Sequence, residues 1–185
     1  MVDEALKQAE SKMQKAIEVT REELSGFRTG RASPNLVERL HVDYYGAQTP
    51  LQQLASITVS DARMLVIHPY DRNAMSSIEK AIMASDLGLN PSNDGTVIRL
   101  AFPQLTEERR KELTKLARER AEHGRVAVRN VRRHAKEEID KDIKDGKVAE
   151  DEGKRAEGTL QKLTDKYVGE IDQLLQRKEA ELMEV

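Results

Sequence analysis

The feature that most constrains this fold is a long stripe of apolar and small residues in the second half of the chain. From Leu113 to Ile139 these residues recur at steps of three and four, which is the spacing of one face of an α-helix. Thr106 is suited to cap the start of this helix, and Gly146 is suited to end it. The helix is therefore predicted to span about 40 residues, or ~60 Å. A helix of this length with a narrow apolar stripe needs partner helices along it.

Two further stretches have the same helical spacing. One begins with Asp3 as its predicted N-cap and runs to about Phe27, and the other runs from about Ala149 to Met183. Aromatic residues make up 3% of the chain and charged residues 35%, a balance typical of long exposed helices rather than of one thick core. Three such helices are predicted to pack as a bundle with crossing angles near ~20°.

Residues from about 31 to 104 have a different pattern. Alternating or continuous apolar residues predict strands near 40–44, 54–59, 64–67 and 98–102. A short helix is predicted over about Asn73 to Leu87, with Gly88 as its stop, and Asn93-Asp94-Gly95 predicts a turn. The fold class is therefore α+β, with a small domain over residues 30–105 inserted into a bundle domain made of residues 1–29 and 106–185.

Two short connections join the predicted domains, and we expect them to form a hinge. The hinge residues are Thr29, Gly30, Arg31, Pro103, Gln104 and Leu105. The glycines beside Arg28 and Arg31 superficially suggest a phosphate-binding loop. That interpretation fails because the glycine spacing is one residue short, Arg31 stands where a lysine is required, and the segment follows a helix rather than a strand. A plain hinge and a hinge that also adds two cations to a binding surface both remain open.

The long central helix carries a concentration of positive charge, although the whole chain has a net charge of −2. Residues 109–136 hold eleven Lys or Arg against three Glu, a local charge of +8. Seven of these cations fall on one helix face beside the apolar stripe, which we call the basic face: Lys111, Lys115, Arg118, Arg125, Arg129, Arg132 and Lys136.

The basic face predicts docking on RNA. The guanidinium fork matches a phosphate bidentately, and a row of arginines can follow a nucleic-acid backbone with affinity supplied by counterion release. The scarcity of aromatics argues against a platform that stacks single-stranded bases. The alternative is an ordinary solvated helix face whose charge is neutralised by acidic neighbours.

Several other classes of function are excluded or disfavoured. The chain has no cysteine, and its four histidines lack metal-ligand spacing, so no metal, cofactor or thiolate chemistry is predicted. Neither a signal-peptide core nor an apolar run of the ~20 residues needed to span a membrane is present. Two rivals to RNA docking remain: a helical scaffold that binds a partner protein, and a hydrolase using His68 with Asp71 or Asp94.

Four stretches of the sequence resemble the bacterial ribosome recycling factors: residues 28–34, 79–91, 105–111 and 125–133. The order of the predicted elements also agrees with that family over essentially the whole chain. The resemblance implies an L-shaped molecule with a three-helix bundle and an inserted β/α/β sandwich domain. It implies a non-enzymatic, monomeric, cytoplasmic translation factor that binds the post-termination ribosome and, with elongation factor G and GTP, splits the subunits and releases them from mRNA. Elongation factor G would hydrolyse the GTP and push the second domain.

The resemblance also assigns the contact surface. The bundle would lie on the rRNA of the large ribosomal subunit, with Arg129 and Arg132 as main contacts and Arg28 and Arg31 near the hinge. With four more cations of the long helix added to these, the predicted rRNA-binding residues are Arg28, Arg31, Arg118, Arg125, Arg129, Arg132, Arg133 and Lys136. One departure is Gly124, a weak helix former in the middle of the long helix, which predicts local instability.

Overall fold

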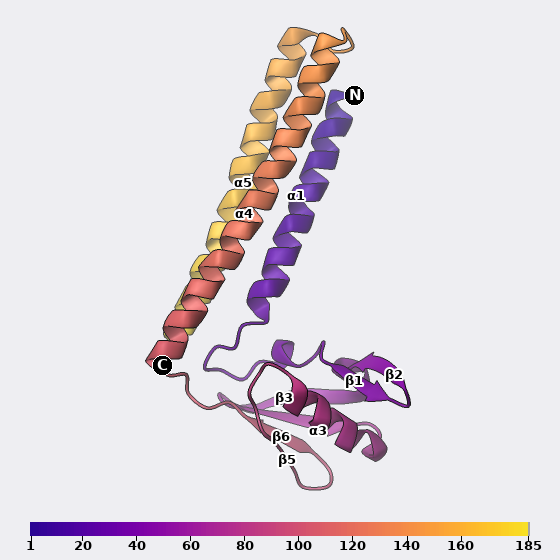
Figure 1. Cartoon of the computed structure of the whole chain (residues 1–185), viewed down its shortest axis with the longest axis vertical. Coiled ribbons are helices and arrows are strands. Elements are labelled where there is room, and N and C mark those ends of the chain that lie inside the picture. The colour runs from indigo at the N-terminus through magenta and orange to yellow at the C-terminus, as the bar shows by residue number, and fades with distance from the viewer. Residues whose placement is uncertain (185) are drawn as a thin grey trace. The chain divides into compact units, whose positions relative to one another are not determined.

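The structure, a computed structural model, describes residues 1–184 and contains three long helices and a small mixed segment (Figure 1). The helices are α1 (Val2–Ser25), α4 (Glu107–Lys144) and α5 (Glu150–Met183). The chain divides into two compact units. The first holds Met1–Leu24 and Glu112–Ala180, and the second holds Ser25–Lys111 with the chain from Glu181 onward. None of the helices in residues 1–184 combines the length and apolar character that crossing a bilayer requires.

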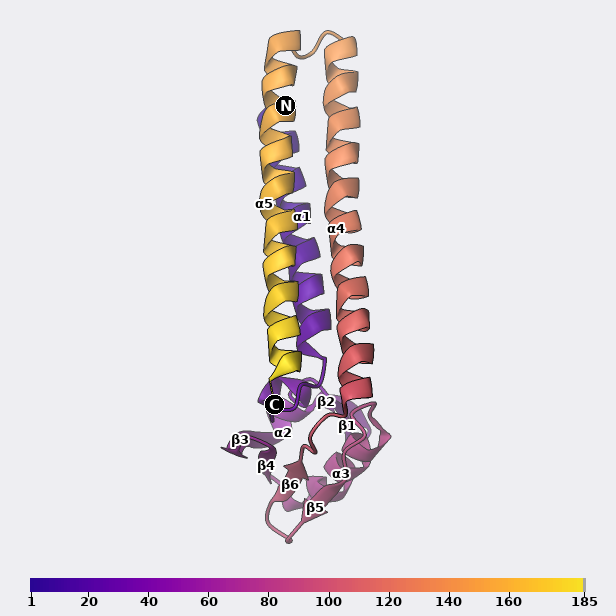
Figure 2. The ribbon, with the colours of Figure 1, turned by 90° about the vertical axis from the view of Figure 1, so that its left-hand side faces the viewer.

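In the first unit, α1, α4 and α5 run side by side and bury their apolar stripes against one another (Figure 2). The centre of this core is formed by residues such as Met13, Val128 and Ile171, which are fully buried. The apolar stripe predicted for α4 is confirmed, with Leu116 and Val131 half-buried at its edges. Burial of these stripes removes apolar surface from water along the bundle. This burial is the main stabilisation available to helices that each carry only a narrow apolar stripe.

Hydrogen bonds and backbone conformation close to each helix end explain where α4 begins and ends and where α1 begins. Thr106 Oγ1 accepts a hydrogen bond of 3.1 Å from the Arg109 N–H, as the predicted N-cap requires. Gly146 follows α4 with a φ of +73°, the left-handed conformation that commonly ends a helix. The predicted cap at Asp3 is wrong. The Ala5 N–H bonds the Met1 carbonyl at 3.0 Å, so the helix begins at Val2 and Asp3 lies inside its first turn.

The second unit contains two antiparallel sheets. Strands β1 (His41–Tyr44) and β2 (Ala47–Pro50) form a hairpin in which Tyr44 pairs with Ala47. The other sheet has the order β3-β4-β6-β5. Its strands are β3 (Ala55–Asp61), β4 (Met64–Pro69), β5 (Pro91–Asn93) and β6 (Ile98–Ala101). Helix α3 (Met75–Ala84) and the single turn α2 (Leu51–Leu54) complete the unit, with short 3-10 turns at Pro34–Leu36 and Arg72–Ala74.

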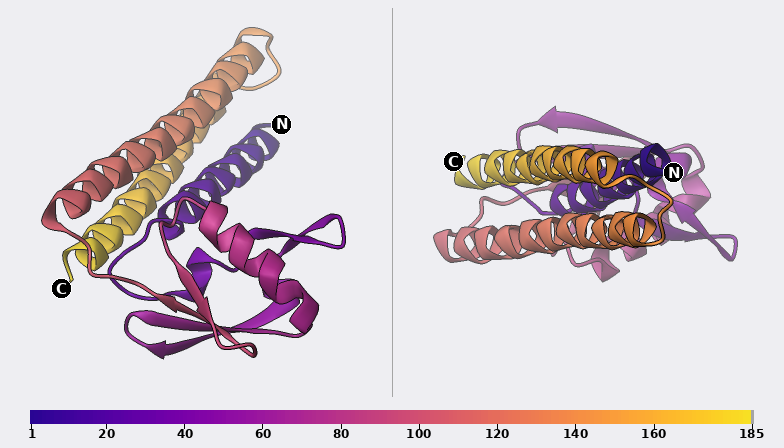
Figure 3. Two further views of the ribbon diagram at one scale, coloured as in Figure 1. Left: turned by 60° about the horizontal axis from the view of Figure 1, so that its bottom comes forward. Right: turned by 90° about the horizontal axis from the view of Figure 1, so that it is seen from above.

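One core joins the two sheets of the second unit through α3, which lies across the four-stranded sheet (Figure 3). Leu65 and Ile67 of β4 alternate inward, and Ile78 and Ile82 of α3 pack against them, while Val42 brings the hairpin into the same core. All five side chains are fully buried. The predicted α+β class, with long helices and a small sheet-containing segment, is confirmed.

Some predicted boundaries differ from the structure. The strand expected from Leu54 begins at Ala55, because residues 51–54 form a helical turn. The helix expected over 73–87 covers only Met75–Ala84, since Ser85 is extended and its hydroxyl donates to the Ile82 carbonyl at 2.6 Å. Strands β2 and β5 were not predicted because their sequences are short, polar and contain proline. They become strands only by pairing with β1 and β6.

Candidate nucleic-acid interface

All seven residues of the basic face lie on α4, and three of them make ion pairs with α5. The pairs join Arg118 Nε to Glu179 Oε1 at 2.6 Å, Arg125 Nε to Asp172 Oδ1 at 2.7 Å, and Lys136 Nζ to Glu157 Oε1 at 3.6 Å. We call these the α4–α5 ion pairs. As the residue number rises along α4 it falls along α5, as expected for antiparallel helices. This side of α4 therefore contacts an acidic neighbour.

Arg125 is the most enclosed member of the basic face. Its side chain is only 18% exposed, and besides Asp172 it contacts Glu122 at 2.9 Å. Burial by itself would lower the pKa of Arg125, but the hydrogen bonds that Arg125 donates to Asp172 and Glu122 outweigh it and raise the pKa. Arg125 is thus held against α5 within the bundle rather than projecting freely from it.

Lys136 is also held by carboxylates. Its ammonium lies 2.8 Å from Asp140 Oδ2, and the hydrogen bond to Asp140, followed by the charge of Glu157, raises the Lys136 pKa. The alternative considered from the sequence, a face neutralised by acidic neighbours, therefore applies to this part of the surface.

Three other arginines of α4 have fewer contacts with carboxylates: Arg129, Arg132 and Arg133. Arg129 is 54% exposed and contacts Glu122 Oε1 at a long 3.3 Å. Within residues 1–184, neither Arg132 nor Arg133 forms an ion pair with a carboxylate. Three guanidinium groups within about one helical turn thus keep donors available to an external anion. We call these three residues the open arginine cluster.

The two arginines near the predicted hinge have different environments. Arg28 Nη2 donates to the Pro103 carbonyl at 2.6 Å, so this side chain ties one connecting segment to the other. Its Nε is buried without a hydrogen-bond partner among the described residues. Burial, and then the charge of Arg109, lower the Arg28 pKa. Arg31 is 72% exposed and lies 3.1 Å from Glu184.

Both connecting segments are attached to the turn between β3 and β4. The Ala32 N–H donates to the Ala62 carbonyl at 2.8 Å, and the Phe102 N–H donates to the Arg63 carbonyl at 2.7 Å. Four further residues of the predicted hinge lie outside helices and strands: Thr29, Gly30, Gln104 and Leu105.

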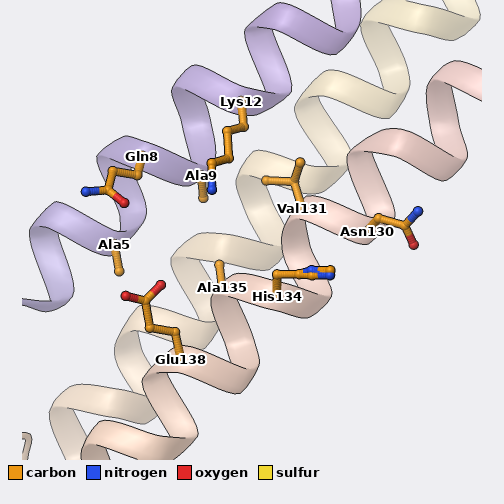
Figure 4. Close-up of a pocket in the computed structure, with 9 residues that line it drawn as sticks. All are labelled: Ala5, Gln8, Ala9, Lys12, Asn130, Val131, His134, Ala135 and Glu138. Carbon is orange, nitrogen blue, oxygen red and sulfur yellow. The ribbon is translucent and has the colours of Figure 1, made fainter.

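A groove of about 220 Å³ lies between α1 and α4, away from the α4–α5 ion pairs (Figure 4). Its apolar lining comes from Ala5, Ala9, Val131 and Ala135, whose small side chains leave this space open. The polar residues around it are Gln8, Lys12, Asn130, His134 and Glu138. Because one lysine is balanced by one glutamate, the groove does not extend the positive charge of the open arginine cluster.

The helical spacing of α4 alone does not predict the α4–α5 ion pairs. The signal that could have found them is the placement of Glu157, Asp172 and Glu179 on one side of α5. Predicting the pairs requires knowing that α5 packs antiparallel to α4 and in which register.

Comparison with known proteins decides the family. The family model described as "Ribosome recycling factor" matches residues 20–183. The chain belongs to the ribosome recycling factor family. Among similar proteins, the ribosome-recycling factor of Thermobifida fusca is 59% identical and that of Acidothermus cellulolyticus 58% identical, each aligned over the whole of both chains. Membership in this family confirms the predicted function, ribosome recycling.

Solved structures of ribosome recycling factors share the fold. The solution structure of one ribosome recycling factor is 48% identical in sequence, has a TM-score of 0.82, and is matched over 100% of this chain and 98% of that one. A second, the Thermus thermophilus factor in models with Escherichia coli elongation factor G bound to the post-termination complex, has a TM-score of 0.71 at 48% identity over both whole chains.

Proposed function

We propose that this chain binds the post-termination ribosome and, together with elongation factor G and GTP, separates the subunits. The observation that supports this most directly is family membership over nearly the whole chain, with one relative described in a complex that contains elongation factor G and the post-termination complex. The chain would act as a cytoplasmic monomer and catalyse no reaction, with GTP hydrolysis left to elongation factor G.

The open arginine cluster would be the principal contact with rRNA of the large subunit. Arg132 and Arg133 have no carboxylate partner within residues 1–184, and Arg129 has only a long contact with Glu122, so their charge is available to phosphates. Arg118, Arg125 and Lys136 would contribute mainly by fixing α5 against α4, because each already has a carboxylate on that helix. This divides the predicted rRNA-binding residues into a docking group and a supporting group.

The two connecting segments would form the hinge between a bundle domain and an inserted domain. Arg28 would hold the segments together through its bond to the Pro103 carbonyl rather than contact RNA directly. Since Ala32 and Phe102 are fixed to the β3–β4 turn, bending would concentrate in residues 29–31 and 103–105.

The test is binding and subunit splitting by Arg132→Ala. Affinity for large ribosomal subunits, measured by co-sedimentation at several salt concentrations, is expected to fall about tenfold, with the log–log salt slope less steep by about one. Splitting of post-termination ribosomes with elongation factor G and GTP, followed by light scattering, should slow in parallel. Arg132→Lys should have an intermediate affinity because it keeps the charge but not the fork.

Lys162→Ala is the matched control, since it removes one exposed cation from α5 and should leave affinity unchanged. Equal affinity of Arg132→Ala and the parent chain at every salt concentration would contradict the docking role. Binding that is insensitive to salt, with no preference for ribosomes, would favour the helical scaffold instead. Size-exclusion chromatography with light scattering tests the monomer.

A further inference from the structure

The groove between α1 and α4, which we call the α1–α4 groove, is a space that the bundle leaves unfilled. Elsewhere large side chains such as Met13 and Ile171 close the core of this unit and are fully buried. In the groove three of the four apolar residues are alanines, and about 220 Å³ stays open. A cavity of about 150 Å³ already accepts a benzene ring. The groove therefore has room for one planar ring system, but not for a helix or a strand.

Figure 4 shows an apolar interior with polar edges. Four apolar side chains face one another between the two helices: Ala5, Ala9, Val131 and Ala135. Gln8 lies at the outer edge on α1, and Asn130 and His134 are directed toward the outer side of α4. A ligand that enters between the methyl groups would thus meet hydrogen-bonding side chains at the mouth.

The two amide side chains at the mouth suit an uncharged ligand with donors and acceptors along its edge. Asn130 and Gln8 each carry both a carbonyl oxygen and an NH₂ group. Gln8 Nε2 donates to Glu4 Oε1 at 3.2 Å, which leaves the Gln8 carbonyl oxygen available. Asn and Gln are the side chains that pair with the edges of nucleobases, and a base is planar and uncharged.

Cations border the groove on both helices. Lys12 and Lys15 follow Gln8 at steps of four and three, so they continue the same side of α1. On α4, Arg133 of the open arginine cluster directly precedes His134. None of these three cations forms an ion pair with a carboxylate in the part of the chain that the structure describes.

The combination of an uncharged slot and unpaired cations corresponds to the two chemical parts of a nucleotide. The base is neutral and has edges that form hydrogen bonds, and the phosphate is an anion that lysine and arginine neutralise. An apolar side chain of a protein partner would use the methyl groups of the groove but would leave Lys12, Lys15 and Arg133 without a counter-charge. The charge of the surface therefore favours RNA over protein as the occupant.

We propose that the α1–α4 groove receives one unpaired base of the RNA on which the open arginine cluster docks. The inference rests on the proposed function, because that function supplies the RNA. Unpaired bases in loops and bulges are the parts of a folded RNA that proteins read individually. The base enters between the methyl groups, its edge bonds Asn130 or Gln8, and its phosphate lies near Arg133 or Lys12. The groove thus adds recognition by shape to a surface that otherwise binds by charge.

Ala135→Leu tests the proposal by filling the groove without changing any charge. The variant should be at least as stable as the parent chain, because the added side chain occupies an empty apolar space. Its affinity for large ribosomal subunits, measured by co-sedimentation, should fall about tenfold. The log–log salt slope should stay at the parental value, because no cation is lost. Ala180→Leu adds the same side chain at an exposed position of α5 and should bind as the parent chain does.

Asn130→Ala provides a second variant that leaves the interior of the groove untouched. Asn130 is exposed, so the melting temperature should not change. Loss of its amide should lower the affinity about threefold, again with the parental salt slope. If Ala135→Leu disturbs the bundle, this variant decides the outcome: parental affinity of Asn130→Ala would then overturn the proposal.

A photoreactive benzoylphenylalanine at position 134 identifies the occupant. Irradiation of the full chain bound to large subunits should crosslink it to an unpaired nucleotide of rRNA, and adding Ala135→Leu should abolish that crosslink. A crosslink only to protein, or none, would overturn the proposal, as would a stable Ala135→Leu variant with parental affinity. Failure of the proposed function has a different signature, because the parent chain itself would then not bind large subunits.

Discussion

Gly124 of α4 packs directly against Thr20 of α1, at a distance that leaves no space for a side chain at position 124. A β-carbon placed there would overlap Thr20 Oγ1 and would also lie 3.1 Å from Ile171 Cδ1 of α5. Thr20 is itself buried, and its hydroxyl donates to the Ala16 carbonyl at 2.9 Å. The glycine that predicted local weakness in α4 is therefore the residue that allows all three helices to approach closely at this level.

Gly124→Ala is expected to destabilise the protein despite the higher helix propensity of alanine. Overpacking at a site of this kind costs about 1–3 kcal/mol of the free energy of unfolding, more than the ~1 kcal/mol gained from propensity. Urea denaturation measures the difference. Gly158→Ala is the control, because position 158 of α5 has open space and should gain stability. A Gly124→Ala variant more stable than the parent chain would contradict the close contact. Adding Thr20→Ala to Gly124→Ala should restore part of the lost stability, because it removes the side chain that the new β-carbon overlaps.

Arg125→Ala is expected to lower stability by about 1 kcal/mol, because it breaks the largely enclosed pair with Asp172. Arg132→Ala should stay within about 0.5 kcal/mol of the parent chain, since its side chain has no carboxylate partner in residues 1–184. Chemical denaturation of both variants provides the measurement. The single variant Asp172→Ala and the double variant Arg125→Ala/Asp172→Ala complete the cycle that isolates the coupling. The reverse order of stabilities would contradict the assignment of Arg125 to the supporting group.

Tyr167→Phe is expected to cost about 1 kcal/mol, because the hydroxyl of the buried Tyr167 donates to Glu10 at 2.8 Å and accepts from Gln14 at 3.1 Å in a partly buried position. Burial, and then the bond to Glu10, raise the pKa of Tyr167. This contribution to stability is therefore complete below pH ~10 and is lost as the pH rises through the folded-state pKa.

Unfolding by urea at neutral and alkaline pH checks this prediction. The parent chain should lose more stability than Tyr167→Phe between the two conditions. Tyr70→Phe serves as control, because Tyr70 is 73% exposed and should show no difference from the parent chain.

Asp94 is expected to titrate near pH 2. The N–H groups of Val97 and Thr96, each 2.9 Å from Oδ1, lower its pKa to about 2, with a further contribution from Arg99. Because the folded-state pKa is depressed, the stabilisation of this turn is complete above pH ~4 and is lost as the pH falls through about 2. Carboxyl NMR titration measures the value. Arg99→Gln should leave it depressed, and an ordinary value in that variant would assign the effect to Arg99 instead.

The site was only partly predictable from the chain. Helical spacing correctly placed the seven residues of the basic face on one helix, and it also placed them beside the apolar stripe. It gave no means of separating Arg125, paired with Asp172, from Arg132, which has no such partner in residues 1–184. That distinction depends on residues 47 positions apart in the chain, and local periodicity contains no information about them.

The sequence by itself determined the elements whose causes are local. The apolar stripe of α4, its cap at Thr106 and its end at Gly146 follow from helical periodicity and short-range hydrogen bonding. Only tertiary structure decided which cations are neutralised, why position 124 must lack a side chain, and that the polar segment Ala47–Pro50 becomes a strand. The reason is physical: each depends on which surface an element meets across the fold, and that surface is supplied by distant parts of the chain.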